Sequence, residues 1–264
     1  MPRANRHFLP NHVWHITHRC HEKTFLLKFS VDRDTWVRWL FEAKKRYGLE
    51  VLNYMATSNH IHLLVYGNSD REVIPRSLQL VAGRTAQEYN RRKRRNGAFW
   101  EDRYHATSVE TESHLTQCML YIDLNMIRAG AVSHPGEWRH CGYHELTACP
   151  RRYGIIARDR LRQLLGMGEN FQDKYIEWIQ KAVATGSMRQ GFWSESVAVG
   201  SREFVEGVRQ QLGARGTGRK TRPLKDTDLH ILQDPIESYN NDFGSENARL
   251  RPENSLLWQI YPDI

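Results

Sequence analysis

The chain has 264 residues, a formal net charge of +8 and a mean hydropathy of −0.67. This length is enough for one domain with a substantial core and a smaller second unit. No apolar run approaches the ~18–20 residues that a membrane-spanning helix needs, so we expect no membrane partner. The excess of lysine and arginine favours a polyanionic partner such as nucleic acid, because neutralised phosphates release their counterions. A charge that serves only solubility is the alternative.

The cysteines and the amino terminus bear on the cellular compartment. Four cysteines are present without a C-x-x-C pair, and no apolar signal core follows the first residues. A cytoplasmic protein with reduced thiols at Cys20, Cys118, Cys141 and Cys149 is the simplest expectation.

The spacing of apolar residues predicts seven elements in the first 130 positions. Strands are predicted at 12–20, 49–57, 60–67 and 104–109, and helices at 31–47, 71–94 and 112–129. Ser58-Asn59 suits a tight turn between the second and third strands, and Gly130 suits the end of the last helix. The order β-α-β-β-α-β-α indicates an α+β fold with a ferredoxin-like antiparallel sheet.

The chain changes character near residue 150. We place a catalytic domain at 1–149 and a carboxyl-terminal extension at 150–264. Leucines and isoleucines at helical spacing predict a mostly helical extension, and the stretch 213–225, rich in Gly, Arg and Lys, predicts a basic linker or mobile loop.

His60-Ile61-His62 is the most informative triplet in the sequence. Side chains alternate along a strand, so both imidazoles lie on one face while Ile61 points into the core. Neutral imidazole nitrogens suit divalent transition metals, and the pair could therefore hold one metal ion. Two histidines with this spacing are more often packed or surface residues, and that alternative remains open.

Tyr121 and Asn125 lie one helical turn apart in the predicted helix 112–129 and point the same way. A tyrosine phenol can act as a nucleophile on a phosphodiester when a metal ion polarises the phosphate. Asn125 would then complete the protein ligands with its side-chain oxygen. The ordinary alternatives are a core tyrosine and a solvated asparagine. Tyr104 is the second candidate nucleophile, but it lacks a neighbouring amide.

Three segments together resemble a known family. Ser58–Val65, Phe99–Tyr104 and Tyr121–Gly130 are similar to motifs of the HUH single-tyrosine transposases, and most similar to the REP-associated tyrosine transposase branch. The similarity covers residues 5–146, and Gly200–Val205 resembles a short motif in the extension of some members. Two positions depart from the pattern, because Ser58 and Met126 stand where prolines are common. Neither change removes a functional group.

The resemblance implies a metal-dependent endonuclease and strand transferase that acts on single-stranded DNA near hairpins. By position, His60 and His62 match the metal-binding pair, Asn125 the third ligand and Tyr121 the nucleophile. The family pattern also implies a 5′-phosphotyrosine intermediate, a released 3′-hydroxyl, and Mg²⁺ or Mn²⁺ as the metal.

Basic residues provide candidate DNA contacts. Five consecutive cations end the predicted second helix: Arg91, Arg92, Lys93, Arg94 and Arg95. Arg103 and Arg128 lie nearer the candidate site. Each could contact phosphate, and each could instead serve the fold through a helix terminus or a salt bridge.

Two other functions remain open at this stage. One is a domesticated protein that binds repetitive palindromic DNA without transposition, and the other is a phosphohydrolase or RNase that uses water in place of tyrosine. The protein could be a monomer or a homodimer, since a helix that carries the nucleophile can be exchanged between subunits. The extension could add DNA affinity or cover the site.

Overall fold

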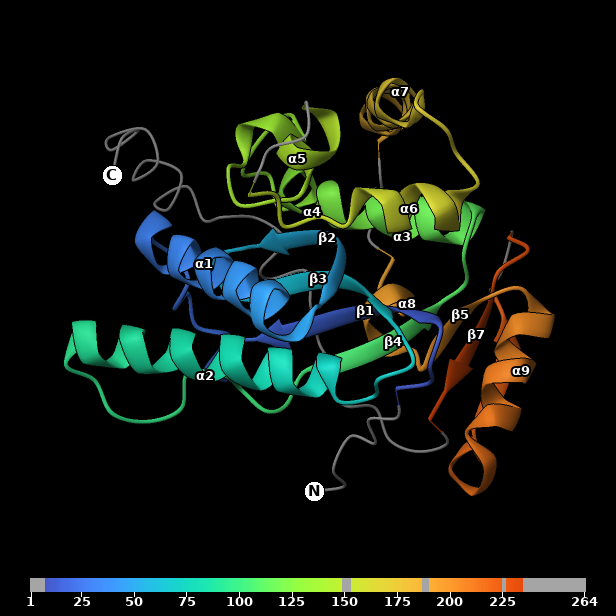
Figure 1. The fold of residues 1–264 in the computed structure, drawn as a ribbon, viewed down its shortest axis with the longest axis horizontal. Coiled ribbons are helices and arrows are strands. Elements are labelled where there is room, and N and C mark those ends of the chain that lie inside the picture. Colours follow the sequence, from blue (N-terminus) through green and yellow to red (C-terminus); the bar gives the residue numbers. More distant parts are fainter. Residues whose placement is uncertain (1–7, 149–152, 187–189, 225–226, 235–264) are drawn as a thin grey trace.

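A seven-stranded sheet with helices on both faces forms the centre of the protein (Figure 1). The computed structural model describes residues 8–148, 153–186, 190–224 and 227–234. The strands are β1 (His12–Arg19), β2 (Glu50–Ala56), β3 (His60–Gly67), β4 (His105–Val109), β5 (Ala198–Gly200), β6 (Lys220–Pro223) and β7 (His230–Gln233). Their order in the sheet is β2-β3-β1-β4-β5-β7-β6.

The first four strands confirm the predicted ferredoxin-like arrangement. All three of their pairings are antiparallel, with β1 between β3 and β4 and with β2 at the edge. Ser58-Asn59 forms the predicted turn between β2 and β3, closed by a hydrogen bond from the Thr57 amide to the His60 carbonyl at 3.0 Å. This turn places the first histidine of the triplet at the first position of β3.

The two faces of the sheet carry different helices. One face is covered by α1 (Ser30–Tyr47) and α2 (Val73–Lys93), and Trp36 of α1 packs near Tyr54 of β2. The other face meets α3 (Ser113–Asp123), where Asn53 donates a hydrogen bond to Asp123 at 3.0 Å. Since alternate residues of a strand face opposite sides, His62 lies on the α3 side and Ile61 in the core with α1 and α2.

The predicted single helix over 112–129 is divided in the structure. It consists of α3 and the short α4 (Asn125–Arg128), with Leu124 between them at φ −83° and ψ 1°. The break directly follows Asp123, which is fully buried and bonded to β2. The amide of Leu124 still donates to the Leu120 carbonyl at 3.0 Å, so the helical ladder continues across the break. Gly130 follows with φ +68°, as expected for a helix end.

The extension has the predicted helices and also three strands that the sequence did not predict. The helices that follow α5 (Tyr143–Thr147) are α6 (Arg158–Leu165), α7 (Phe171–Thr185), α8 (Phe192–Glu195) and α9 (Arg202–Gln211). β5 pairs with β4 in parallel and continues the sheet of the first four strands into β7 and β6. The boundary at 149/150 stays a prediction.

The prediction of a basic linker at 213–225 is wrong for most of that stretch. Gly213–Gly216 form a 3-10 helix and Lys220–Pro223 form β6. β6 is an edge strand with mostly exposed side chains, so it lacks the apolar alternation that would reveal a strand. Its partner β7 provides the buried residues Ile231 and Leu232.

Two sequence expectations can be compared with the described residues. Cys20, Cys118 and Cys141 are buried free thiols, while Cys149 lies outside the described residues. Among the helices of the described ranges, none is both long and apolar enough to cross a bilayer.

Candidate active site

The two histidines of the triplet converge, as the strand pattern predicts. Both lie on β3 on the α3 side of the sheet, and their Nε2 atoms are 3.1 Å apart. His62 is buried with 1% of its surface exposed, whereas His60 is partly exposed. The pair is therefore open to solvent on one side only.

The turn before β3 orients His60. The Nδ1 atom of His60 lies 2.7 Å from the Asn59 side-chain oxygen and 3.0 Å from the Thr57 hydroxyl. An amide oxygen accepts hydrogen bonds, so Nδ1 carries the proton and donates it to Asn59. Nε2 of the same neutral ring is then the acceptor nitrogen, and it is the atom that faces His62.

His62 is held on both ring nitrogens. Its Nδ1 lies 2.9 Å from Nε2 of His15 on β1, and its Nε2 lies 3.0 Å from the amide nitrogen of Asn125. Burial holds the pKa of His62 well below 6.5, and the nearby His60, His15 and Arg128 lower it further. Burial likewise lowers the pKa of His15 to about 4. At neutral pH both rings are uncharged, which is the form that binds metals.

The donor set fits a divalent cation. Ligand atoms at right angles around an ion of the size of Mg²⁺, each about 2.1 Å from it, are about 3 Å apart. The separation of the two Nε2 atoms is close to this value. Rotation of the Asn125 amide by 180° would direct its oxygen to the same place. In the described part of the chain, no three His, Cys, Asp or Glu side chains gather as a metal site, and the further donor beside the two histidines is the amide of Asn125.

Tyr121 lies beside the histidines and is buried by neighbouring side chains. Its ring centroid is 5.8 Å from that of His62 and 6.0 Å from that of His15, and 7% of its surface is exposed. The guanidinium of Arg128 lies over the ring at 4.4 Å. The phenol oxygen is 3.3 Å from the hydroxyl of Ser194 in α8. Tyr121 and Asn125 thus reach the same imidazole, as predicted from their spacing.

Tyr104, the second candidate nucleophile, lies elsewhere. Its ring contacts His18 edge to face at 6.2 Å and stacks near Phe8 at the same distance. His18 pairs with Ile61, so it lies on the opposite face of β1 from His15. The structure therefore places Tyr121, and not Tyr104, near His62.

In the basic run at the end of α2, three of the five cations make contacts within the protein. Arg92 pairs with the buried carboxylate of Asp32, Lys93 lies 5.0 Å from the ring of Phe29, and Arg95 donates to a backbone oxygen in the following turn at 2.8 Å. These three cations therefore stabilise the fold in addition to contributing positive charge to the surface.

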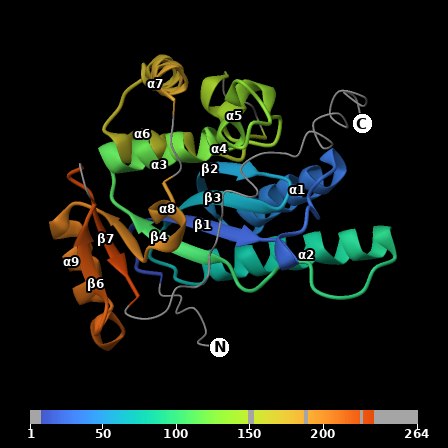
Figure 2. The same ribbon diagram turned by 180° about the vertical axis from the view of Figure 1, so that it is seen from behind.

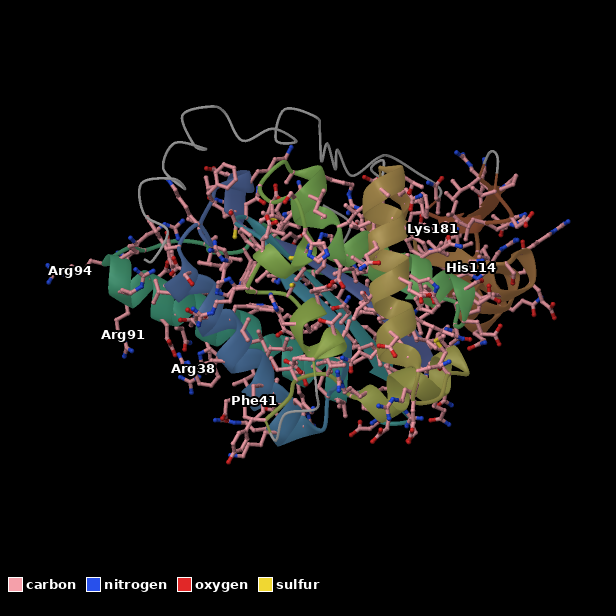
Figure 3. All side chains as sticks on the ribbon, turned by 90° about the horizontal axis from the view of Figure 1, so that it is seen from above. Arg38, Phe41, Arg91, Arg94, His114 and Lys181 are labelled. Carbon is pink, nitrogen blue, oxygen red and sulfur yellow. The ribbon has the colours of Figure 1, made fainter. Side chains whose placement is uncertain are left out.

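The remaining predicted cations differ in their exposure. Arg91 and Arg94 are exposed and point away from the body of the protein at the end of α2 (Figure 3). Arg103 is exposed in the segment before β4. Arg128 donates to the backbone oxygen of Tyr121 in addition to covering its ring. In this structure the side chain of Arg128 therefore packs against α3 and does not extend into solvent as Arg91 and Arg94 do.

Sequence reasoning missed the part of the site that comes from the extension. The short helix α8 lies against β1 and β4 on the same face as α3 (Figure 2). Its Trp193 carbonyl lies 2.7 Å from Nδ1 of His15, and Ser194 meets Tyr121. These contacts join residues 178 and 73 positions apart. No local pattern signals them, although covering the site was one of the two roles considered for the extension.

Comparison with known proteins agrees with the geometry. Residues 9–125 match the family model described as "Transposase IS200 like". This part of the chain is similar to the IS200-like transposases. The match ends at Asn125, so all four candidate residues lie inside it and the α8 contacts lie outside. No curated protein matches the sequence significantly.

Two solved structures resemble this chain at low identity. A REP-associated tyrosine transposase bound to a REP hairpin is 14% identical, covers 55% of this chain and 84% of its own, and has a TM-score of 0.44. A candidate transposase from Deinococcus radiodurans is 18% identical, covers 45% of this chain and 94% of its own, and has a TM-score of 0.32. Since both TM-scores are below 0.5, the likeness to IS200-like transposases rests on the match over residues 9–125.

Proposed function

We propose that this protein is an IS200-like transposase that nicks and rejoins single-stranded, hairpin-bearing DNA through Tyr121, with His60, His62 and Asn125 as metal ligands. The observation that supports this most is the convergence of the other three side chains on the buried imidazole of His62. The resemblance of the sequence to REP-associated transposases supports a hairpin within a repetitive palindromic element as the substrate.

The proposed reaction balances without an external energy source. The phenol oxygen of Tyr121 attacks the scissile phosphorus, and the bond from phosphorus to the 3′ oxygen breaks. The phenol proton is lost and the leaving oxygen gains a proton, which gives a 5′-phosphotyrosine and a free 3′-hydroxyl. Attack by such a hydroxyl on the phosphotyrosine reverses these bond changes and rejoins a strand.

The chain's own residues have separate tasks in this reaction. Bound Mg²⁺ or Mn²⁺ would polarise the scissile phosphate and offset charge on the leaving oxygen. The neutral donors His60, His62 and Asn125 would leave the full charge of the ion available to an anionic substrate. Arg128 supports the Tyr121 ring, over which its guanidinium lies. The exposed Arg91 and Arg94 are suited to backbone phosphate.

A covalent-adduct assay tests the proposal. The full chain is incubated with end-labelled hairpin-bearing single strands and Mn²⁺, and the products are separated on a denaturing gel. We expect a protein-linked label that is absent with EDTA and absent from Tyr121→Phe. Tyr104→Phe, the matched control, should retain the adduct. An adduct that persists in Tyr121→Phe would contradict the assignment of the nucleophile, and cleavage without any adduct would favour a water-using phosphohydrolase or RNase.

One observation favours a second candidate function. The phenol of Tyr121 is 7% exposed and its oxygen is engaged by Ser194, so the side chain must move before it can reach a phosphate. A domesticated protein that binds palindromic DNA without transposition would tolerate such a covered nucleophile. Tight hairpin binding without cleavage or adduct, in the same assay, would support this second function.

A further inference from the structure

His15 is a fully buried histidine that the proposed reaction has not yet used. It lies at the middle of β1, opposite Leu64 of β3, and shares a face of the sheet with His62. Its ring stacks against that of His62 at a centroid distance of 5.1 Å and an interplanar angle of 12°. Both of its nitrogens make short polar contacts, 2.7 Å to the Trp193 carbonyl and 2.9 Å to Nδ1 of His62.

The partners fix the direction of each hydrogen bond. A backbone carbonyl only accepts, so Nδ1 of His15 donates to Trp193. A neutral imidazole has one N–H, and a fully buried ring without a carboxylate partner remains neutral. Nε2 of His15 is therefore an acceptor, and Nδ1 of His62 must donate to it. The nitrogen of His62 that faces His60 is then an acceptor as well.

The contact of Asn125 with the other ring nitrogen of His62 leads to the same tautomer. The Asn125 amide nitrogen lies 3.0 Å from Nε2 of His62, and an amide nitrogen only donates. Nε2 of His62 is again the acceptor, so its proton lies on Nδ1. In this orientation of its amide, Asn125 agrees with the assignment made from the α8 side. Once the amide is turned so that its oxygen faces a metal, it no longer donates to His62, and the contact with His15 is the one that holds the proton on Nδ1.

We propose that His15 is a positioning residue that holds His62 in the Nδ1-protonated form with Nε2 turned to the metal, and that α8 of the extension anchors it. This inference rests on the proposed function, because it assigns a task at the same site. The structural reason is that a histidine ligand needs a partner for its second nitrogen to fix its tautomer and orientation. His60 obtains that partner from its own turn, and His62 obtains it from a distant part of the chain.

The anchor in α8 is itself firmly held. The side chain of Trp193 is fully buried and its ring nitrogen donates to Gln190 at 2.9 Å. The carbonyl of Ser196 accepts hydrogen bonds from Thr107 at 2.6 Å and from His105 at 2.9 Å. Two residues of β4 thus fix the segment that presents the Trp193 carbonyl to His15.

Two substitutions at His15 separate its hydrogen-bonding role from its packing. Glutamine retains one donor and one acceptor on a planar group, so His15→Gln can bridge Trp193 and His62. His15→Leu fills the space but bridges neither. His18→Leu is the matched control, because His18 is also buried on β1 and bonded to a backbone carbonyl, at 2.8 Å, but faces the other side of the sheet. Circular dichroism and thermal unfolding establish that each full-length variant is folded.

The first measurement needs no metal. Long-range ¹H–¹⁵N spectra of the full chain, with His62 assigned through His62→Gln, report which ring nitrogen carries the proton. We expect Nδ1 in the wild type, in His18→Leu and in His15→Gln, and a mixture or Nε2 in His15→Leu. A wild-type His62 that is protonated on Nε2, or a tautomer unchanged in His15→Leu, would overturn the inference.

The second measurement is the affinity for Mn²⁺ without DNA, followed by electron paramagnetic resonance. Loss of such a supporting partner typically costs 10- to 100-fold in metal affinity. We expect this loss in His15→Leu and a recovery to within a few-fold in His15→Gln. Wild-type affinity in His15→Leu would refute the role of His15 while leaving the proposed function intact. Absence of Mn²⁺ binding in the wild type would instead count against the metal site, and the tautomer spectra would still decide the role of His15.

Discussion

Asp123 offers a quantitative test of how the extension is joined to the catalytic sheet. Its carboxyl is fully buried between α3, β2 and α7, and it accepts hydrogen bonds from Asn53 and from Tyr175. Burial raises its pKa from 3.8 to about 7, although both hydrogen bonds act to lower it. We examine the substitution Asp123→Asn, which keeps the size of the side chain and cannot ionise.

The direction of the pH effect follows from linkage. Between pH 4 and pH 7 the carboxyl is protonated in the folded protein and ionised in the unfolded chain, so unfolding releases a proton. Stability contributed by this group therefore falls as the pH rises through that range. One pH unit corresponds to about 1.4 kcal/mol, and the slope levels off as the pH reaches the folded pKa of about 7. From pH 5 to pH 7 the wild type should therefore lose about 2 kcal/mol relative to Asp123→Asn.

Urea unfolding of both proteins at pH 5 and at pH 7.5 measures this difference. Buried histidines such as His15 and His140, whose pKa values burial lowers to about 4, give the opposite slope, but they are common to both proteins and cancel. We expect the free energy of unfolding of the wild type to fall relative to the variant as the pH rises. A difference that is the same at both pH values would refute the assignment of a raised pKa to Asp123.

Two further predictions concern the surface and the packing around β2. The double variant Arg91→Ala/Arg94→Ala should bind hairpin DNA more weakly. The slope of log affinity against log salt should become smaller by about 1.4, the value for two single-strand phosphate contacts. Lys181→Ala on α7 is the control and should leave that slope unchanged (Figure 3). Fluorescence anisotropy at several salt concentrations measures this, and an unchanged slope would remove both arginines from the DNA interface. Gly142→Ala should lower the free energy of unfolding by about 1–3 kcal/mol, because its Cβ would lie 2.1 Å from the Asn53 side-chain oxygen. Gly207→Ala in α9, where nothing lies within 4 Å, is the control, and equal stabilities of the two variants in urea would contradict the packing argument.

The sequence predicted the parts of the fold that local patterns determine. The hairpin of β2 and β3 was predicted because two β-forming runs flank Ser58-Asn59, and period-2 alternation placed His60 and His62 on one face. Helical spacing likewise placed Tyr121 and Asn125 together, even though Leu124 interrupts the helix. These features depend on neighbours a few residues away.

The rest depends on contacts that no local pattern encodes. β5 has only three residues and β6 has mostly exposed side chains, so neither shows the alternation of a half-buried strand. The role of His15 depends on the register between β1 and β3 and on a carbonyl of Trp193. A sequence shows that His15 exists but not which ring it faces.

The pairing of β4 with β5 has a consequence for how the protein is made. Synthesis starts at the amino terminus, so β1 to β4 leave the ribosome while β5 and α8 are still being added. During that interval the outer edge of β4 has no strand beside it, and His15 has no Trp193 carbonyl to bind. A nascent chain at that point would therefore have the candidate ligands and Tyr121 without the contacts from the extension. Only a chain elongated past Gly200 contains both β5 and the Trp193 carbonyl that His15 binds.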